Sequence, residues 1–571
     1  MILQALYDYF ERRKDEFPPL QMALVCFKYA ILIDEKGNFK GFEALGDEDG
    51  AYLLAYRPEE RTSSPVPHCL GDNGSYVLGL KDINPQNEIK ISAELKKNDK
   101  NHNAFKKDVE FLYKKLPANK NVKAIYLFYQ HYGEDIIKVM CEDANWPKLC
   151  KFLNKNITFR VVGETCLAAS DEEVLKYKIS NAVNDNEPTI CLVTGQKAKP
   201  VNTTYSTFIV GGKSNAKLVS FQVSSGYDSY GKKMGHNATI SEEAEFKYTT
   251  ALLSMLSKGS RNKFLIGNRT FLFWASKNDD AGSQAEESIF SLFGFQDQDD
   301  DPNRGIEQVR KVFTSIFTGS IKTSLDDKFF ILGLAPNSAR IAVTYWAEIP
   351  LKEFASLILR HFDDMEIIDT RKEPKPYMSL RSILSAVTLG GKASDATPNL
   401  PEAIVKSIFQ GIAYPYTLFA GCVRRVRAEQ NVGITRAAIM KAYLNRKTNT
   451  NEIKVMLDKE NQNQGYLCGR LFAVLDKIQG DANSQHTIRE RYMNAASATP
   501  AAVFATILNL SSHHSEKLSE GSKVYYEKLK QEIIDKISAD GFPAHLDLQD
   551  QGRFFVGYYH QQQSFYAKND E

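Results

Sequence analysis

A glycine-rich stretch that ends in lysine and serine is the first candidate for chemistry in this sequence. Residues 207–214 read T-F-I-V-G-G-K-S, close to the loop whose backbone amides and lysine hold the phosphates of a nucleotide. Thr207, however, stands where that loop needs its first glycine. The residues after Ser214 are expected to return to a strand rather than to open a helix, so the stretch does not predict nucleotide hydrolysis.

Histidines and carboxylates give little support for a metal centre. The nearest cluster is R-H-F-D-D at residues 360–364, in which His361 and Asp363 would share one face of a strand, but two ligands are too few to hold a metal. His513 and His514 are adjacent, and adjacent side chains on a helix diverge. We therefore expect a protein that is not an enzyme and that binds neither a cofactor nor a metal.

The overall charge is balanced. The chain has 571 residues, with 72 Lys and Arg against 70 Asp and Glu, so binding to nucleic acid would have to come from local patches. The eight cysteines include no C-x-x-C pair, which disfavours a zinc site or a disulfide framework and favours a reducing cytoplasm. We find no signal-peptide pattern and no apolar run of about 18 residues, so no membrane partner is expected.

The first basic patch lies between Lys197 and Lys233, where six lysines face a single acid, Asp228. Small and amide-bearing residues in this patch would let the backbone approach a phosphate and would offer donors and acceptors to base edges. A solvated hairpin is the alternative interpretation. The candidate DNA-binding residues here are Gly211, Gly212, Lys213, Ser214, Asn215, Lys217, Gln222, Lys232 and Lys233.

The first part of the second basic patch runs from Ile404 to Arg446, where seven cations are opposed only by Glu429. Its later candidates extend to Arg489. Arg424 and Arg427 would share one helix face, which suits sequence-independent contact with a phosphate backbone. A surface ridge that pairs with acids or with a protein partner is the alternative. The candidates for supporting a nucleic-acid strand are Arg424, Arg425, Arg427, Arg436, Lys441, Arg470, Lys477 and Arg489.

The elements that must position these residues predict an α+β protein in three parts. Residues 1–186 mix helices with β-rich runs at 24–33, 122–129 and 157–162, and residues 88–103 are expected to be a mobile loop or an exposed helix that is a candidate nucleic-acid contact. Residues 187–375 are β-rich, with an acidic surface loop near 296–302. Strands are expected at 190–193, 208–210, 218–222, 270–275, 329–334 and 341–346.

The third part, residues 376–571, is expected to be an all-helical bundle. Apolar residues recur there at intervals of three and four, and strand signals nearly vanish. Helices are expected near 403–410, 416–429, 435–445, 467–478, 500–513 and 524–537.

Several longer strings, in a fixed order along the chain, resemble one protein family. They are M-I-L-Q-A-L-Y-D-Y-F at 1–10, D-N-G-S-Y-V-L-G at 72–79, L-V-S-F-Q at 218–222 with S-Y-G-K at 229–232, L-G-L-A-P-N-S-A-R-I at 332–341, G-R-L-F-A-V-L-D-K-I-Q at 469–479, T-I-R-E-R-Y at 487–492, A-S-A-T-P at 496–500 and G-Y-Y-H-Q at 557–561. Together they resemble the large subunit of the type I-C CRISPR surveillance complex, Cascade.

This resemblance implies a role in reading DNA. The N-terminal part would recognise the protospacer-adjacent motif (PAM) in a target duplex and help to part the strands, and the helical part would support the displaced single strand. Asn73, in the D-N-G-S loop, and the segment from Gly211 to Gln222 would lie near the PAM. The family's first loop more often reads D-N-A-E, and its second has Gln and Ser where this chain has Lys213 and Asn215.

The resemblance also implies partners. These are the target duplex, the displaced strand, guide RNA held by other Cascade subunits, the backbone and guide-end-binding subunits, a helicase-nuclease, and a small subunit translated from the C-terminal region, starting at Met440 or Met456. Two other functional classes stay open. One is a nuclease or ATPase that would need His361 or Lys213, and the other is a structural adaptor whose basic helices face guide RNA or protein.

Overall fold

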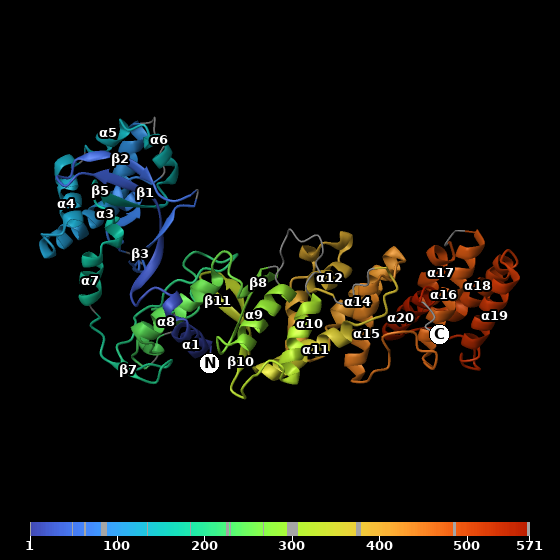
Figure 1. Cartoon of the computed structure of the whole chain (residues 1–571). Helices are drawn as coiled ribbons and strands as arrows, with labels where there is room; N and C mark the ends of the chain where they lie inside the picture. The colour runs from blue at the N-terminus through green and yellow to red at the C-terminus, as the bar shows by residue number, and fades with distance from the viewer. Residues whose placement is uncertain are drawn as a thin grey trace. The chain divides into compact units, whose positions relative to one another are not determined.

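The chain forms two compact units. Its computed structural model describes residues 2–47, 49–61, 64–81, 88–133, 135–182, 184–223, 228, 230–266, 268–293, 306–372, 378–483 and 487–567. Unit 1 comprises Met1–Thr207 and Lys217–Leu253, and unit 2 comprises Phe208–Ala216 and Ser254–Glu571. This division is coarser than the three predicted domains, which stay a prediction. The mixture of strands and helices early in the chain, followed by helices alone, confirms the α+β class (Figure 1).

Unit 1 is built on a mixed sheet whose strands run in the order β2-β1-β5-β4, with β3 paired to the first half of β1. The long strand β1 is antiparallel to β2 and β3 and parallel to β5, and β4 closes the sheet beside β5. The strands are β1 (Met22–Ile33), β2 (Phe39–Ala44), β3 (Ala51–Tyr56), β4 (Gly71–Asn73) and β5 (Asn156–Val161).

Helices complete unit 1 and bury its core. Phe128, from α4, packs edge-on against Phe159 of β5, and Phe10 of α1 packs against Phe246 of α8. The helices are α1 (Ile2–Arg12), α2 (Gly74–Val77), α3 (Glu88–Lys115), α4 (Lys120–Tyr132), α5 (Ile136–Cys141), α6 (Trp146–Leu149), α7 (Glu172–Ser180) and α8 (Glu242–Leu256), which ends in unit 2. A two-stranded ribbon of β6 (Thr189–Ile190) and β7 (Lys197–Ala198) lies between α7 and α8 in the chain.

One strand prediction for unit 1 was wrong, and one segment predicted as a loop or a helix is a helix. Residues 122–129 were expected to form a strand but lie in α4, because Asn119 caps that helix by accepting a hydrogen bond from the Val122 amide (2.9 Å). Residues 88–103, predicted to be a mobile loop or an exposed helix, form the first part of the helix α3, and most of their described side chains are exposed or half-buried, although Asn98 and His102 are buried. The Nδ1 atom of His102 lies 2.9 Å from the Tyr76 carbonyl oxygen, so this part of α3 is packed rather than mobile.

The strands predicted at 208–210 and 218–222 were also wrong, because no ladder forms there. Side chains bond the backbone instead. Thr207 accepts a hydrogen bond from the Leu218 amide through its Oγ1 atom (3.2 Å), and the Thr204 hydroxyl donates to the Val219 carbonyl. Such local bonds compete with strand pairing.

Unit 2 begins with an antiparallel sheet in the order β11-β10-β9-β8. Its strands are β8 (Lys263–Ile266), β9 (Arg269–Ala275), β10 (Lys328–Asn337) and β11 (Arg340–Pro350), and the helices α9 (Asp280–Phe293), α10 (Ile306–Thr318) and α11 (Leu351–Met365) belong to the same core. The strands predicted at 270–275, 329–334 and 341–346 are confirmed. The predicted acidic loop at 296–302 lies outside the described residues.

The remainder of unit 2 is helical, as predicted (Figure 1). The central pair is α16 and α20, which are buried along most of their length. The helices are α12 (Leu380–Ala386), α13 (Leu400–Gln410), α14 (Tyr416–Glu429), α15 (Ile434–Thr448), α16 (Gln464–Asn483), α17 (Thr487–Ala498), α18 (Pro500–Ser515), α19 (Glu520–Ile534) and α20 (Leu548–Ser564). None of the helices within the described part of the chain is long and apolar enough to cross a membrane.

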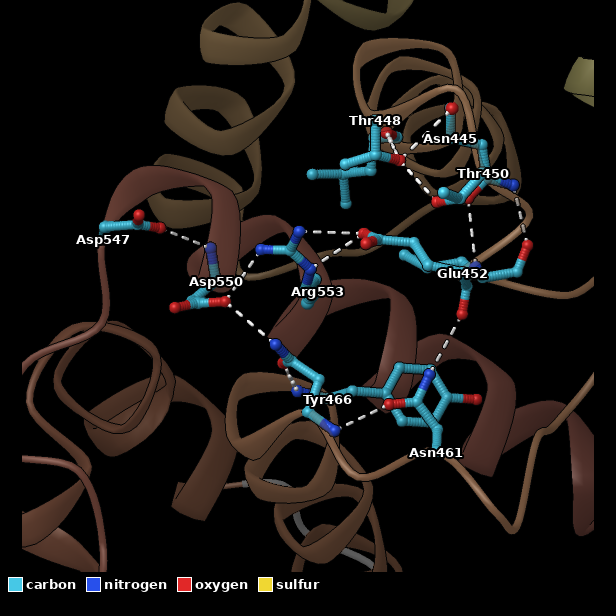
Figure 2. Close-up of polar contacts among 12 residues, drawn as sticks. Asn445, Thr448, Thr450, Glu452, Asn461, Tyr466, Asp547, Asp550 and Arg553 are labelled. Atoms are coloured by element: carbon cyan, nitrogen blue, oxygen red, sulfur yellow. Dashed lines mark hydrogen bonds and ion pairs between the residues drawn. The ribbon is translucent and has the colours of Figure 1, made fainter.

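Polar contacts fix the connection between α15 and α16 to the start of α20 (Figure 2). Arg553 donates to Glu452 (2.9 Å) and to Asp550 (2.8 Å), and Asp550 also accepts from Asn463 (3.2 Å). The side-chain Nδ2 amide of Asn461 donates to the Glu452 backbone carbonyl (3.2 Å). This connection is therefore part of the bundle rather than a loose loop.

Candidate nucleic-acid interface

Asn73 is presented at the end of β4, where it caps the short helix α2. Its Oδ1 atom accepts hydrogen bonds from the Ser75 amide (3.0 Å) and the Ser75 hydroxyl (2.6 Å). Both bonds use the carbonyl oxygen, and among the described residues the Nδ2 amide of Asn73 has no partner. Asn73 can therefore act toward a ligand only as a hydrogen-bond donor.

A buried carboxylate holds the Asn73 loop in place. Asp72 is fully buried, and it accepts hydrogen bonds from the amides of Asn73 (2.7 Å) and His68 (2.9 Å) as well as from the Arg61 guanidinium. Burial lowers the pKa of His68 to about 4, so His68 is neutral near pH 7. Arg61 is therefore the cation that balances Asp72, and it also lies over the Tyr76 ring, 4.1 Å from its centre.

The segment from Phe208 to Ala216 forms turns and carries the next group of predicted DNA-binding residues. Two tight turns follow one another, closed by bonds from Gly212 to the Ile209 carbonyl (2.9 Å) and from Ala216 to the Lys213 carbonyl (3.0 Å). Ile209 and Ala216 are buried anchors. Lys213, Ser214, Asn215 and Gly211 are exposed, and Gly212 is half-buried.

The same segment does not form a nucleotide-binding loop. Gly211 adopts a positive φ of 78°, and a Cβ atom added there would lie 3.5 Å from the ring of Pro336 near the end of β10. The described residues that follow Ser214 form a turn and then irregular backbone, without the helix whose first turn would hold a phosphate.

Lys217 does not project its charge to solvent. Its Nζ atom lies 3.2 Å from a Glu60 carboxylate oxygen and donates to the Thr203 hydroxyl (3.0 Å), and only 15% of the side chain is exposed. Lys217 therefore stabilises the protein's own backbone at this point.

Three further candidates in the first patch are exposed, namely Gln222, Lys232 and Lys233. Tyr230, beside the two lysines, is fully exposed. Tyr227, which the sequence places among these residues, lies outside the described residues.

In the second patch, Arg424 and Arg427 are exposed on α14. Within the described ranges neither has an ion-pair partner. Arg425 and Arg436 differ, because both bind Glu429, with distances of 2.5 Å for Arg436 and 2.9 Å for the Arg425 Nε atom. Of the four arginines, Arg424 and Arg427 are thus the pair available to a phosphate backbone.

Lys441 and Arg470 lie inside the bundle, so the prediction that they contact a nucleic-acid strand does not fit their positions. Lys441 donates to the Asp364 carbonyl (2.9 Å), and Arg470, which is fully buried, donates to Gln561 and Glu532 (3.1 Å each). Helical spacing alone does not distinguish an exposed cation from one that buried acceptors satisfy.

The last two candidates of this patch are partly engaged with neighbouring acids. Lys477 pairs with Asp481 at 2.5 Å. Arg489 is half-buried beside Tyr558 and Asp476.

The histidine and carboxylate cluster at residues 360–364 does not converge on one site. The segment is helical, not a strand, so His361 points into the core while Asp363 pairs with Arg310 (3.0 Å). His361 lies 2.7 Å from the Tyr414 hydroxyl, and burial, together with the charge of Arg446, lowers its pKa to about 3. No group of three or more potential metal ligands occurs in the described residues.

Sequence reasoning missed a charged segment that contacts the Asn73 loop. Residues 57–61 read R-P-E-E-R and directly follow β3. Residues 57–60, together with Tyr205 and Glu245, line a cavity of about 600 Å³ within unit 1. The only signal was a pair of glutamates between two arginines, next to a proline, and this pattern is equally typical of a solvated turn.

Comparison with known proteins gives one match that spans nearly the whole chain. The family model described as CRISPR-associated protein (Cas_Csd1) matches residues 3–566. A search of curated proteins found no relative that matches.

Proposed function

The chain belongs to the Cas_Csd1 family of CRISPR-associated proteins, the large subunits of type I-C Cascade, and from this membership we propose that it reads the PAM of a target duplex without catalysing a reaction. Other Cascade components are its partners. Reading a PAM requires donors or acceptors that are held still at a protein surface.

The observation that carries this proposal is the geometry of Asn73. Its carbonyl is occupied by Ser75, and the buried Asp72 fixes the backbone on which it sits. The amide that remains can donate to the acceptors that bases present, such as purine N7 in the major groove or purine N3 and pyrimidine O2 in the minor groove. The exposed turn with Lys213 and Asn215 would add phosphate and polar contacts.

Asn73→Ala should weaken binding to PAM-containing duplex by roughly 5- to 150-fold, the loss expected for about 1–3 kcal/mol of base discrimination. Binding to duplex without a PAM should be unchanged. The measurement is competition binding of assembled, guide-loaded complex at fixed salt, with a duplex library randomised beside the guide-matched sequence. Asn154→Ala, an exposed asparagine of the same unit, is the control.

Lys213→Gln, measured in the same assay, should weaken binding to all duplexes alike and lower the slope of log affinity against log salt by about 1. An Asn73→Ala complex with the PAM preference of the wild type would contradict the proposal. DNA cleavage or ATP turnover by the purified chain, lost on substitution of His361 or Lys213, would instead favour a catalytic role.

For the helical part we propose that Arg424 and Arg427 support the displaced single strand. Replacing both with glutamine should lower the salt slope for single-strand binding by about 1.4, at about 0.7 for each phosphate contact. Fluorescence anisotropy with labelled single-stranded DNA measures this, and the control is the double substitution of two other exposed cations, Arg491 and Lys528. Loss of co-purifying guide RNA and subunits with unchanged strand affinity would favour the adaptor role instead.

The proposed set of partners includes a small subunit made from the C-terminal region, and the structure bears on where it would begin. Met440 is buried in the middle of α15, whereas Met456 is exposed and lies before α16. A product that starts at Met456 contains α16 to α20 whole and keeps the bond between Asn463 and Asp550, although it lacks Glu452. We therefore favour Met456, and propose that the helicase-nuclease is recruited to the assembled complex.

A further inference from the structure

We propose that residues 57–61 act as a brace that couples the Asn73 loop to the neck of the Lys213 turn. DNA contact at Asn73 would then favour DNA contact at Lys213. The neck consists of residues 203–207 and 217–219, which flank that turn in the sequence. The inference rests on the proposed function and assigns positioning roles to Arg57, Glu60 and Arg61.

One end of the brace holds the Asn73 loop. Arg61 donates from Nε to the Val66 carbonyl (2.9 Å), and its guanidinium binds the Asp72 carboxylate. Asp72 in turn accepts from the Asn73 amide. A displacement of Arg61 would therefore move the backbone that carries the Asn73 side chain.

The other end holds both sides of the neck. The Glu60 carboxylate accepts from the Ser206 amide (2.6 Å) and the Ser206 hydroxyl (2.8 Å), and it lies 3.2 Å from Lys217 Nζ. Lys217 then binds Thr203 and the Thr204 carbonyl. One carboxylate thus ties together two chain segments that are adjacent to Lys213 in the sequence but about 150 residues away from Glu60.

Arg57 anchors the brace to the body of unit 1. Its guanidinium donates to Glu245 (2.8 Å) and to the Thr249 hydroxyl (2.7 Å), and lies 4.0 Å from the centre of the Tyr205 ring. The second Glu245 oxygen accepts from the Tyr205 amide (2.8 Å). The neighbouring amides of Tyr205 and Ser206 therefore bind two different glutamates: Glu245, which Arg57 holds, and Glu60, which belongs to the brace.

These contacts are shielded from water, which makes them stiffer than surface ion pairs. The exposed fractions of the side chains are 13% for Arg57, 7% for Glu245, 19% for Glu60 and 15% for Lys217. Charges that are partly desolvated interact more strongly than exposed ones, and losing one partner is costly for the other. Because Glu60 and Arg61 are adjacent and both engaged, ordering one loop reduces the cost of ordering the other.

The test is a double-mutant cycle for PAM-duplex affinity of the assembled complex. In the otherwise wild-type chain, the loss caused by Asn73→Ala with Lys213→Ala together should differ from the product of the two single losses by roughly tenfold, as for coupled residues. In a Glu60→Ala background the losses should multiply to within about twofold. Glu60→Gln, which keeps an acceptor for Ser206, should restore part of the coupling.

The outcomes are distinct. Glu59→Ala, at the exposed neighbouring carboxylate, should leave the tenfold coupling intact, and thermal unfolding checks that each variant is folded. Single losses that simply multiply in the wild-type chain, or coupling that survives Glu60→Ala in a folded protein, would overturn the brace alone. Single variants without any effect would overturn the proposed function and the brace with it.

Discussion

Asp72→Ala should abolish PAM-dependent binding and lower the free energy of unfolding by about 3–5 kcal/mol, the cost of leaving a buried charge without its partner. Asp72 is fully buried, and its carboxylate is the acceptor for Arg61 and for the amides of His68 and Asn73. Alanine would leave all three donors without this acceptor. This carboxylate therefore holds the backbone of the candidate base-reading residue, Asn73.

Hydrogen exchange followed by mass spectrometry gives a local readout, because the amides of His68 and Asn73 should lose their protection in the Asp72→Ala chain. Denaturant unfolding of the same chain measures the global loss. Asp135→Ala removes an exposed carboxylate of unit 1 that pairs with Lys138 at the surface, and should change stability by no more than about 0.5 kcal/mol. Equal stability and equal protection in the two variants would show that Asp72 does not hold the loop.

The sequence predicted where positive charge is concentrated, but it did not predict which cations are exposed and which bind other residues of the protein. The arginines at 424, 425, 427 and 436 look alike in a list of cations, yet Glu429 binds Arg425 and Arg436 and not the other two. Arg470 stands in a helical pattern that suited a surface stripe, but Gln561, 91 residues later, accepts one of its hydrogen bonds inside the bundle. Partners this far apart leave no trace in local spacing.

The helices and strands also differ in how well the sequence predicts them. The helical part was predictable because apolar residues recur at helical intervals over many turns. The run at 122–129 was not, because its aromatic and β-branched residues suit a strand as well as a buried helix, and the choice is made by the cap at Asn119 and by packing on β5. The brace was invisible for a further reason, since Glu60 and Ser206 lie 146 residues apart.

The sequence alone gave no physical reason for the strings that indicate the family. The structure supplies a reason for two of them. Gly469 opens the string on α16 and Gly557 opens the string on α20. A Cβ atom at Gly469 would overlap the Phe554 carbonyl, and one at Gly557 would overlap the Tyr466 carbonyl. The backbones of the two central helices therefore touch, and only glycine allows this approach.

Gly469→Ala should consequently destabilise the helical part by about 3 kcal/mol or more, at the upper end of the cost of overpacking, because the obstacle is backbone and cannot rotate away. Thermal unfolding followed by circular dichroism measures the change. Gly521→Ala is the matched control on α19, where nothing lies within 4 Å of the added methyl group. Alanine should be neutral or stabilising there, by up to about 1 kcal/mol, because it favours a helix over glycine. Two substitutions of the same chemistry should thus differ in effect, and equal melting temperatures would mean that α16 and α20 do not approach as closely as their glycines allow.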